Sequence, residues 1–273
     1  MGKTVFLMVL LMLLFMYVGD AVAGYQGMMS AFWIACAMNL GSYFFSDKLV
    51  LSQYKAKEVT METAPDLYSI VARLAAQANL PMPKVYIIPE QVPNAFATGR
   101  NPKHAAVAAT QGLLNLMTPE EIEGVLAHEM SHVRHYDILI GSIAAMFAGA
   151  ISMLGRSAQN NSQGSSRRVG LLGVILVPIA ATVIQMSISR AREYKADEGA
   201  AYLTGHPEWL MSALNKLEGY ASKYQMQRAS QQTAHMFIVN PFSGIPGLTK
   251  LFSTHPSTQD RIARLEQIRA SLH

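Results

Sequence analysis

Two histidines and a glutamate stand in HExxH spacing at His128, Glu129 and His132. On a helix, residues four apart lie on one face, so both imidazoles can bind the same metal ion. The glutamate beside the first histidine can then act as general base toward a water at that ion. Two histidines, a carboxylate and an open coordination position are typical of zinc hydrolases. The motif therefore predicts a zinc-dependent hydrolase, and the alternative is a pair of surface histidines.

Zinc needs a third protein ligand, and Glu193 is the candidate. Asp197 lies one turn later on the same helical face, where its carboxylate could accept a hydrogen bond from a ligand histidine and fix the tautomer. The alternative is a solvated helix of mixed charge, because several charged residues surround these two. They are Arg190, Arg192, Lys195 and Glu198.

Two further features could serve catalysis. His255 precedes a proline in a predicted turn and could donate a hydrogen bond to an oxyanion, or it could be an ordinary loop or capping histidine. The extended segment Asn94, Ala95, Phe96 and Ala97 could pair its main chain with a peptide substrate as an added strand. Its alternative is an ordinary half-buried strand.

The sequence pattern predicts the helices and strands that position these residues. Thr118 and Glu121 form a capping box, with Pro119 at the first helical position, so the HExxH helix begins there. Apolar spacing predicts a helix over residues 64–79, and three strands are expected over 84–89, 94–99 and 105–110. We expect a mostly helical α+β fold with a small antiparallel sheet.

Long apolar stretches predict a membrane protein. Hydrophobic residues make up 51% of the chain and charged residues only 15%. Residues 5–18 and 27–45 read as an uncleaved helical hairpin rather than a secretory signal. Lysines at its two ends, with none in its loop, put both ends in the cytoplasm.

A second apolar pair covers residues 138–155 and 169–188. Arginines in the loop between them oppose the positive-inside rule, so the pair either spans the membrane or lies buried in the protein. His132 and Glu193 can share one metal only if an even number of membrane crossings separates them. Both interpretations of this pair satisfy that condition.

Composition excludes several kinds of site and partner. A single cysteine, Cys36, rules out disulfide frameworks and cysteine-based metal sites within one chain, so any metal must use His, Asp or Glu. The net charge is +4, but the basic residues are scattered and mostly flank apolar stretches. That distribution suits anionic lipid headgroups and predicts no nucleic-acid partner.

Four motifs carry a family resemblance: PNAFATG at residues 93–99, the block at 118–137, SRAREYKAD at 189–197 and STHPSTQDRI at 253–262. With these, the chain resembles the HtpX-type heat-shock membrane zinc metallopeptidases, relatives of the CAAX prenyl protease family. The order of the motifs and of the apolar stretches extends the resemblance over nearly the whole chain.

The resemblance implies a bacterial inner-membrane endopeptidase whose active site faces the cytoplasm and which degrades misfolded or damaged membrane proteins under stress. It implies a zincin-like (gluzincin) domain carried by two to four transmembrane helices, with one zinc ion per chain. By motif, the zinc ligands are His128, His132 and Glu193, and Glu129 is the base. Asp197 supports a ligand, and His255 and Arg261 belong to an HPxxxxR element beside the site.

The expected organisation has four segments. An N-terminal transmembrane hairpin covers 1–57, and the first part of the catalytic domain covers 58–137. The second apolar hairpin covers 138–189, and the rest of the catalytic domain covers 190–273. Three alternatives to an endopeptidase stay open: a prenyl-protein (CAAX-type) protease, an inactive metal-binding membrane chaperone or adaptor, and a purely structural membrane protein.

Overall fold

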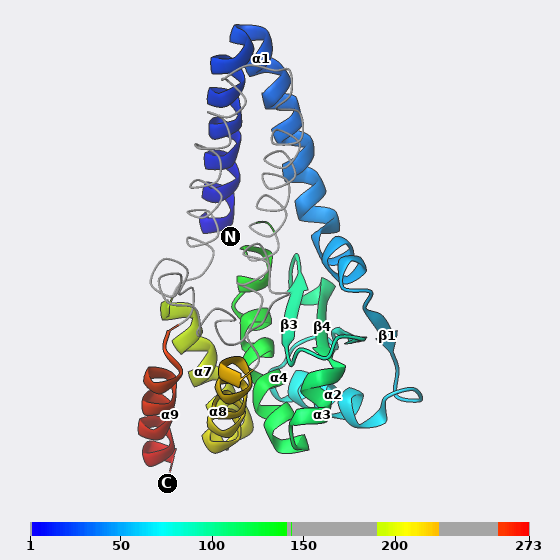
Figure 1. Ribbon diagram of the computed structural model, residues 1–273, viewed down its shortest axis with the longest axis vertical. Helices are drawn as coiled ribbons and strands as arrows, with labels where there is room; N and C mark the ends of the chain where they lie inside the picture. Colours follow the sequence, from blue (N-terminus) through cyan, green and yellow to red (C-terminus); the bar gives the residue numbers. More distant parts are fainter. Residues whose placement is uncertain (1, 141–142, 144–189, 224–255, 273) are drawn as a thin grey trace.

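A long helical hairpin rises from a body of helices with one small sheet at its side (Figure 1). The computed structural model describes residues 2–140, 143, 190–223 and 256–272. Within them the chain is mostly helical, as expected. The C-terminus lies at the end of the body away from the hairpin (Figure 1).

The hairpin is helix α1 (Gly2–Gln53), which reverses at Ala23 and Gly24. Gly24 has a φ of +60°, which glycine adopts without the steric cost that other residues meet. The two halves of α1 lie close together near the reversal. A Cβ added to Gly19 would collide with the carbonyl of Gly27, so glycine is needed there. Further along, the Asn39 side chain donates a hydrogen bond to the Met8 carbonyl oxygen at 3.2 Å.

The outer surface of the hairpin is strongly apolar. Large side chains such as Phe6, Trp33 and Leu40 are more than half exposed. Ala23–Phe45 is long and apolar enough to cross a membrane, and Thr4–Tyr17 is a shorter apolar helix. Among the described residues, only the longer helix meets that length.

The sheet contains four strands in the order β1-β2-β4-β3. They are β1 (Lys57–Val59), β2 (Lys84–Ile88), β3 (Ala95–Gly99) and β4 (Ala105–Thr110). The β1–β2 and β3–β4 pairs are antiparallel, but β2 and β4 are parallel. The expectation of an antiparallel sheet is therefore wrong, and the sheet is mixed.

The insertion of β4 between β2 and β3 explains the parallel pair. All six residues of β4 are buried, and four of them are alanines, which suits a central strand covered on both faces. The chain passes from β2 to the far edge, forms β3, turns through the short 3₁₀ helix Pro102–His104 and returns as β4. This leaves β3 at one edge of the sheet.

Six helices complete the described body. They are α2 (Pro65–Gln77), α3 (Gln111–Leu116), α4 (Pro119–Arg134), α7 (Arg190–Thr204), α8 (Pro207–Lys223) and α9 (Thr258–Leu272). The predicted capping box of α4 is present, with Thr118 and Glu121 exchanging side-chain hydrogen bonds to each other's backbone N–H. Gly124 of α4 lets the backbone of Leu210 in α8 approach, since an added Cβ would lie 2.7 Å from its nitrogen.

The predicted second apolar pair lies almost wholly outside the described residues. Its described residues, 138–140 and 143, are helical. Leu139, Ile140 and Ile143 pack against Leu7 and Leu11 of the first α1 leg. The start of this stretch therefore contacts the N-terminal hairpin.

Candidate active site

Helix α4 places its HExxH residues on its buried face. His128 and Glu129 are almost fully buried, and His132 lies one turn later with 15% of its side chain exposed. Apolar neighbours including Val125, Leu126 and Met130 fix this helix in the core. The first turn of α7 lies against α4 and carries Glu193, which is also buried.

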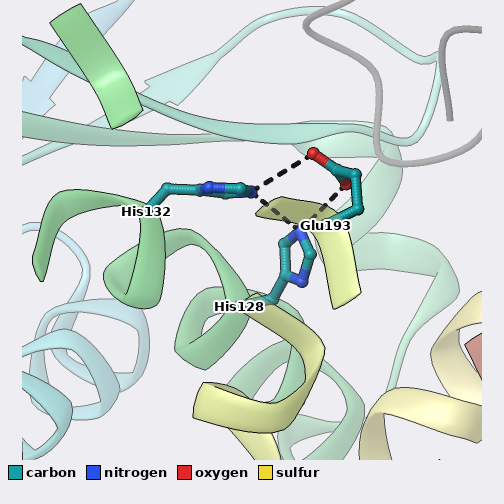
Figure 2. Close-up of side chains that lie close together, drawn as sticks. All are labelled: His128, His132 and Glu193. Carbon is teal, nitrogen blue, oxygen red and sulfur yellow. Dashed lines mark hydrogen bonds and ion pairs between the residues drawn. The ribbon is translucent and has the colours of Figure 1, made fainter. Parts of the chain in front are cut away.

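The side chains of His128, His132 and Glu193 point toward one another (Figure 2). The two histidine Nε2 atoms are 3.2 Å apart, and the Glu193 oxygens lie 3.6 Å from His128 Nε2 and 3.5 Å from His132 Nε2. Ligands about 2.0–2.1 Å from a tetrahedral ion lie about 3.3–3.4 Å from one another. The spacing of these three donors therefore fits zinc.

The opposite nitrogens of the two rings support the same conclusion. Nδ1 of His128 lies 2.9 Å from an Asp197 oxygen, and Nδ1 of His132 lies 3.3 Å from an Asp137 oxygen. A carboxylate accepts a proton donor, so each Nδ1 carries the hydrogen and each Nε2 can present a lone pair. Two lone pairs directed at one point, with a carboxylate beside them, form a donor set for a cation.

Without a metal, a proton takes the same place at His128. Burial disfavours the imidazolium, but hydrogen bonds to Asp197 and Glu193 outweigh it and raise the pKa of His128 to about 9. A metal ion would replace this proton at Nε2 and leave the Asp197 contact intact.

Asp197 and Arg261, which we call the inner pair, lie behind His128. Arg261 donates from Nε to Asp197 Oδ2 at 2.8 Å and from Nη2 to Oδ1 at 2.6 Å, and both side chains are nearly fully buried. Burial opposes the Asp197 charge, but Arg261 and His128 lower the pKa of that carboxyl to about 2. The structure thus brings both sequence-predicted residues together behind a predicted ligand.

Asp137 and Arg192, the outer pair, lie behind His132 and were not predicted. Arg192 Nη1 is 3.7 Å from Asp137 Oδ1, and both side chains are about 15% exposed. The only sequence signal was a carboxylate five residues after His132, just beyond the helix end. In the sequence, Arg192 stands only among the mixed charges around Glu193.

Glu129 lies beside the three donors and contacts the sheet. Its Oε2 accepts a hydrogen bond from the backbone N–H of Ala97 in β3 at 2.9 Å. Burial raises the pKa of Glu129, while the nearby histidines lower it. A raised pKa brings a carboxylate closer to the range useful for proton transfer.

The predicted substrate segment is the edge strand β3 with the residue before it. The Asn94 carbonyl accepts from Thr110 N–H, so Asn94 faces β4. By antiparallel alternation Ala95 and Ala97 direct their N–H and C=O groups away from β4, toward the side where Glu129 lies. Phe96 is buried against Tyr54. The predicted catalytic residue His255 lies outside the described residues.

Comparisons with known proteins point to one protein family. The model of peptidase family M48 matches residues 61–269. HtpX protease homologues of Campylobacter curvus and Campylobacter concisus are 63% and 62% identical to this chain, covering 97% of it and 96% of their own lengths. The homologue of Sulfurovum sp. is 55% identical, with 98% and 99% covered.

A solved structure extends the likeness at the level of fold. The crystal structure of S. mikatae Ste24p aligns with a TM-score of 0.54 and 18% identity, covering 93% of this chain and 61% of that one. The resemblance to HtpX-type metallopeptidases is confirmed by the family match and the high identities. The chain therefore belongs to peptidase family M48 and is a metallopeptidase.

Proposed function

We propose that this protein is a membrane-integrated, zinc-dependent endopeptidase that cleaves misfolded or damaged membrane proteins. The observation that carries the zinc site is the convergence of His128 Nε2, His132 Nε2 and a Glu193 oxygen, all within 4.8 Å of one another. They would hold one zinc ion per chain. Zinc supplies Lewis-acid chemistry, lowering the pKa of a water and polarising a carbonyl.

Glu129 is the proposed base. Its carboxylate would take the proton from the attacking water and deliver it to the leaving amine. The Ala97 N–H fixes one of its oxygens, which leaves the other oxygen to handle the proton. The inner pair holds the His128 ring with Nδ1 protonated. His255 is proposed to stabilise the oxyanion, which is one of the roles that its place in the sequence leaves open.

The edge strand is the proposed substrate site. A peptide aligned with β3 could exchange main-chain hydrogen bonds with Ala95 and donate one to the carbonyl of Ala97, while the Ala97 N–H stays on Glu129. This alignment would direct the scissile carbonyl of the peptide toward Glu129. Such recognition depends on backbone and suits unfolded chains of many sequences. Ala95→Pro removes one outward N–H and no bond to β4, so peptide KM should rise while zinc content stays the same. An unchanged KM would remove β3 from the substrate site.

The membrane assignment rests on α1. Its apolar outer surface and the length of Ala23–Phe45 support insertion in a bilayer, with lipid as a partner. We propose the four-segment organisation 1–57, 58–137, 138–189 and 190–273, with the catalytic parts on the cytoplasmic side of the bacterial inner membrane. Labelling single introduced cysteines in the turn at Gly24 and near Lys57, from each side of the membrane, tests this orientation.

Casein hydrolysis by the purified full chain tests the catalytic assignment. We expect Glu129→Gln to keep zinc and to lose at least about a hundredfold in rate, since general-base catalysis contributes about 10²–10⁴-fold. Glu120→Gln, an exposed glutamate in the first turn of the same helix, is the matched control and should keep full activity. Native hydrolysis by Glu129→Gln would sink the assignment. Stoichiometric zinc without any turnover in the native protein would favour a metal-binding chaperone.

A further inference from the structure

We infer that Asp137 is a positioning residue that holds the zinc ligand His132, and that Arg192 in turn holds Asp137. This inference rests on the proposed function, in which His132 binds zinc. It assigns a role to a carboxylate and an arginine that the sequence motifs left without one.

The geometry around His132 repeats the arrangement around His128. Each ring has a carboxylate within hydrogen-bond reach of Nδ1, and each carboxylate is paired with an arginine. Arg261 Nη2 also lies 3.4 Å from His128 Nδ1. Asp137 reaches His132 Nδ1 with Oδ2 and Arg192 with Oδ1, so one carboxylate contacts both groups. A carboxylate on Nδ1 fixes the tautomer and raises the basicity of a metal-bound histidine.

The residue before Asp137 has a strained backbone conformation, and this conformation directs the Asp137 carboxylate toward His132. Helix α4 ends at Arg134, and Tyr136 then adopts a φ of +60°. Positive φ is unfavourable for a bulky residue, and such residues persist where surrounding contacts enforce them. Tyr136 is 44% exposed, so burial of its ring does little to offset the cost. The turn directs Asp137 back toward His132, which lies in the last turn of α4.

The outer pair also joins two ends of the chain. Asp137 begins the helical residues that pack on Leu7 and Leu11, while Arg192 lies in the first turn of α7. Residues 138–191 lie between them in the sequence. The ion pair therefore joins two residues that lie far apart in the sequence and links the packing of residues 139, 140 and 143 on α1 to the orientation of a metal ligand.

Zinc affinity of the full-length protein in detergent tests the inference, measured by competition with a chromophoric chelator. Loss of a carboxylate partner of a ligand histidine typically costs about 10–100-fold in metal affinity. Asp137→Ala should weaken zinc binding at least about tenfold. Asp137→Asn keeps the shape and one acceptor oxygen, so its loss should be smaller. Arg192→Gln should give a loss of a few-fold.

Matched controls come from the same helix as Arg192. Glu198→Gln and Arg190→Gln change exposed charges of α7 that make no ion pair among the described residues, and both should bind zinc as the native protein does. The absorption spectrum of bound Co²⁺ should change in Asp137→Ala and not in the controls. Thermal unfolding of each zinc-free variant reports folding separately.

The outcomes are distinct. Native zinc affinity and a native Co²⁺ spectrum in both Asp137 variants would overturn the inference and leave the proposed function standing. Equal weakening in the controls would overturn it too, because the effect would then be general. A native protein that binds no zinc would overturn the proposed function and this inference together.

Discussion

The inner and outer pairs support two equivalent ligands in unequal ways. Asp197 and Arg261 are 2% and 1% exposed and are joined by two short hydrogen bonds. Asp137 and Arg192 are 16% and 15% exposed and are joined by a single 3.7 Å ion pair. The inner pair ties α7 to α9 inside the core, so its loss should damage the fold as well as the site. The outer pair is partly exposed, so its loss should damage the site alone.

Removing the inner arginine should have the largest effect. Arg261→Met leaves the Asp197 carboxylate buried without its cation, and breaking a buried pair in this way costs about 3–5 kcal/mol. Arg192→Met breaks a partly exposed pair, whose worth is about 0–1 kcal/mol. Urea unfolding of the zinc-free proteins in detergent measures both free energies of unfolding. Similar losses for the two variants would remove the distinction between the pairs.

Zinc affinity should separate the two aspartates next. Asp197→Asn and Asp137→Asn each remove one negative charge next to a ligand histidine. We expect Asp197→Asn to cost near the upper end of the usual 10–100-fold range and Asp137→Asn near or below its lower end, since burial strengthens the inner contact. Chelator competition measures both. A greater loss in Asp137→Asn would reverse the order proposed here.

The pH dependence of zinc binding should arise on the inner side, at His128. The folded pKa of His128, about 9, is above its ordinary value of 6.5. Protonation therefore stabilises the zinc-free fold fully below about pH 6.5, and this stability is lost as pH rises through 9. Zinc must displace that proton, so its affinity should rise about tenfold per pH unit between about 7 and 9.

The Asp197→Asn variant checks the origin of this pH dependence. It removes a carboxylate that raises the pKa of His128, so the rise in zinc affinity should level off at a lower pH. Asp137→Asn should leave the levelling pH where it is in the native protein. Zinc titrations at a series of pH values measure the two profiles, and identical profiles for both variants would exclude His128 as the group that titrates.

Local signals in the sequence predicted much of this arrangement. The capping box at Thr118 placed the start of the HExxH helix, and the requirement for a third ligand pointed to Glu193. The capping box follows from short-range chemistry, whereas Glu193 depended on the family motif, because the charges around it also fit a solvated helix. The mixed sheet was missed because the pairing of β2 with β4 depends on where the chain inserts β4, which strand patterns alone do not contain.

Asp137 was missed for a related reason. Its approach to His132 depends on a left-handed residue at Tyr136, and glycine or asparagine would have indicated such a turn where tyrosine does not. Arg192 reaches the site only through the packing of α7 on α4. Contacts made across elements far apart in sequence had no local signature.

The zinc content of the native protein and of Glu193→Ala tests the central claim most directly, since Glu193 is the donor supplied by the second helix. Metal analysis of the purified full chains should give about one zinc ion per native chain and almost none in Glu193→Ala, because zinc sites of this kind need three protein ligands. Stoichiometric zinc held with native affinity by Glu193→Ala would contradict the claim that α4 and α7 form the metal site together.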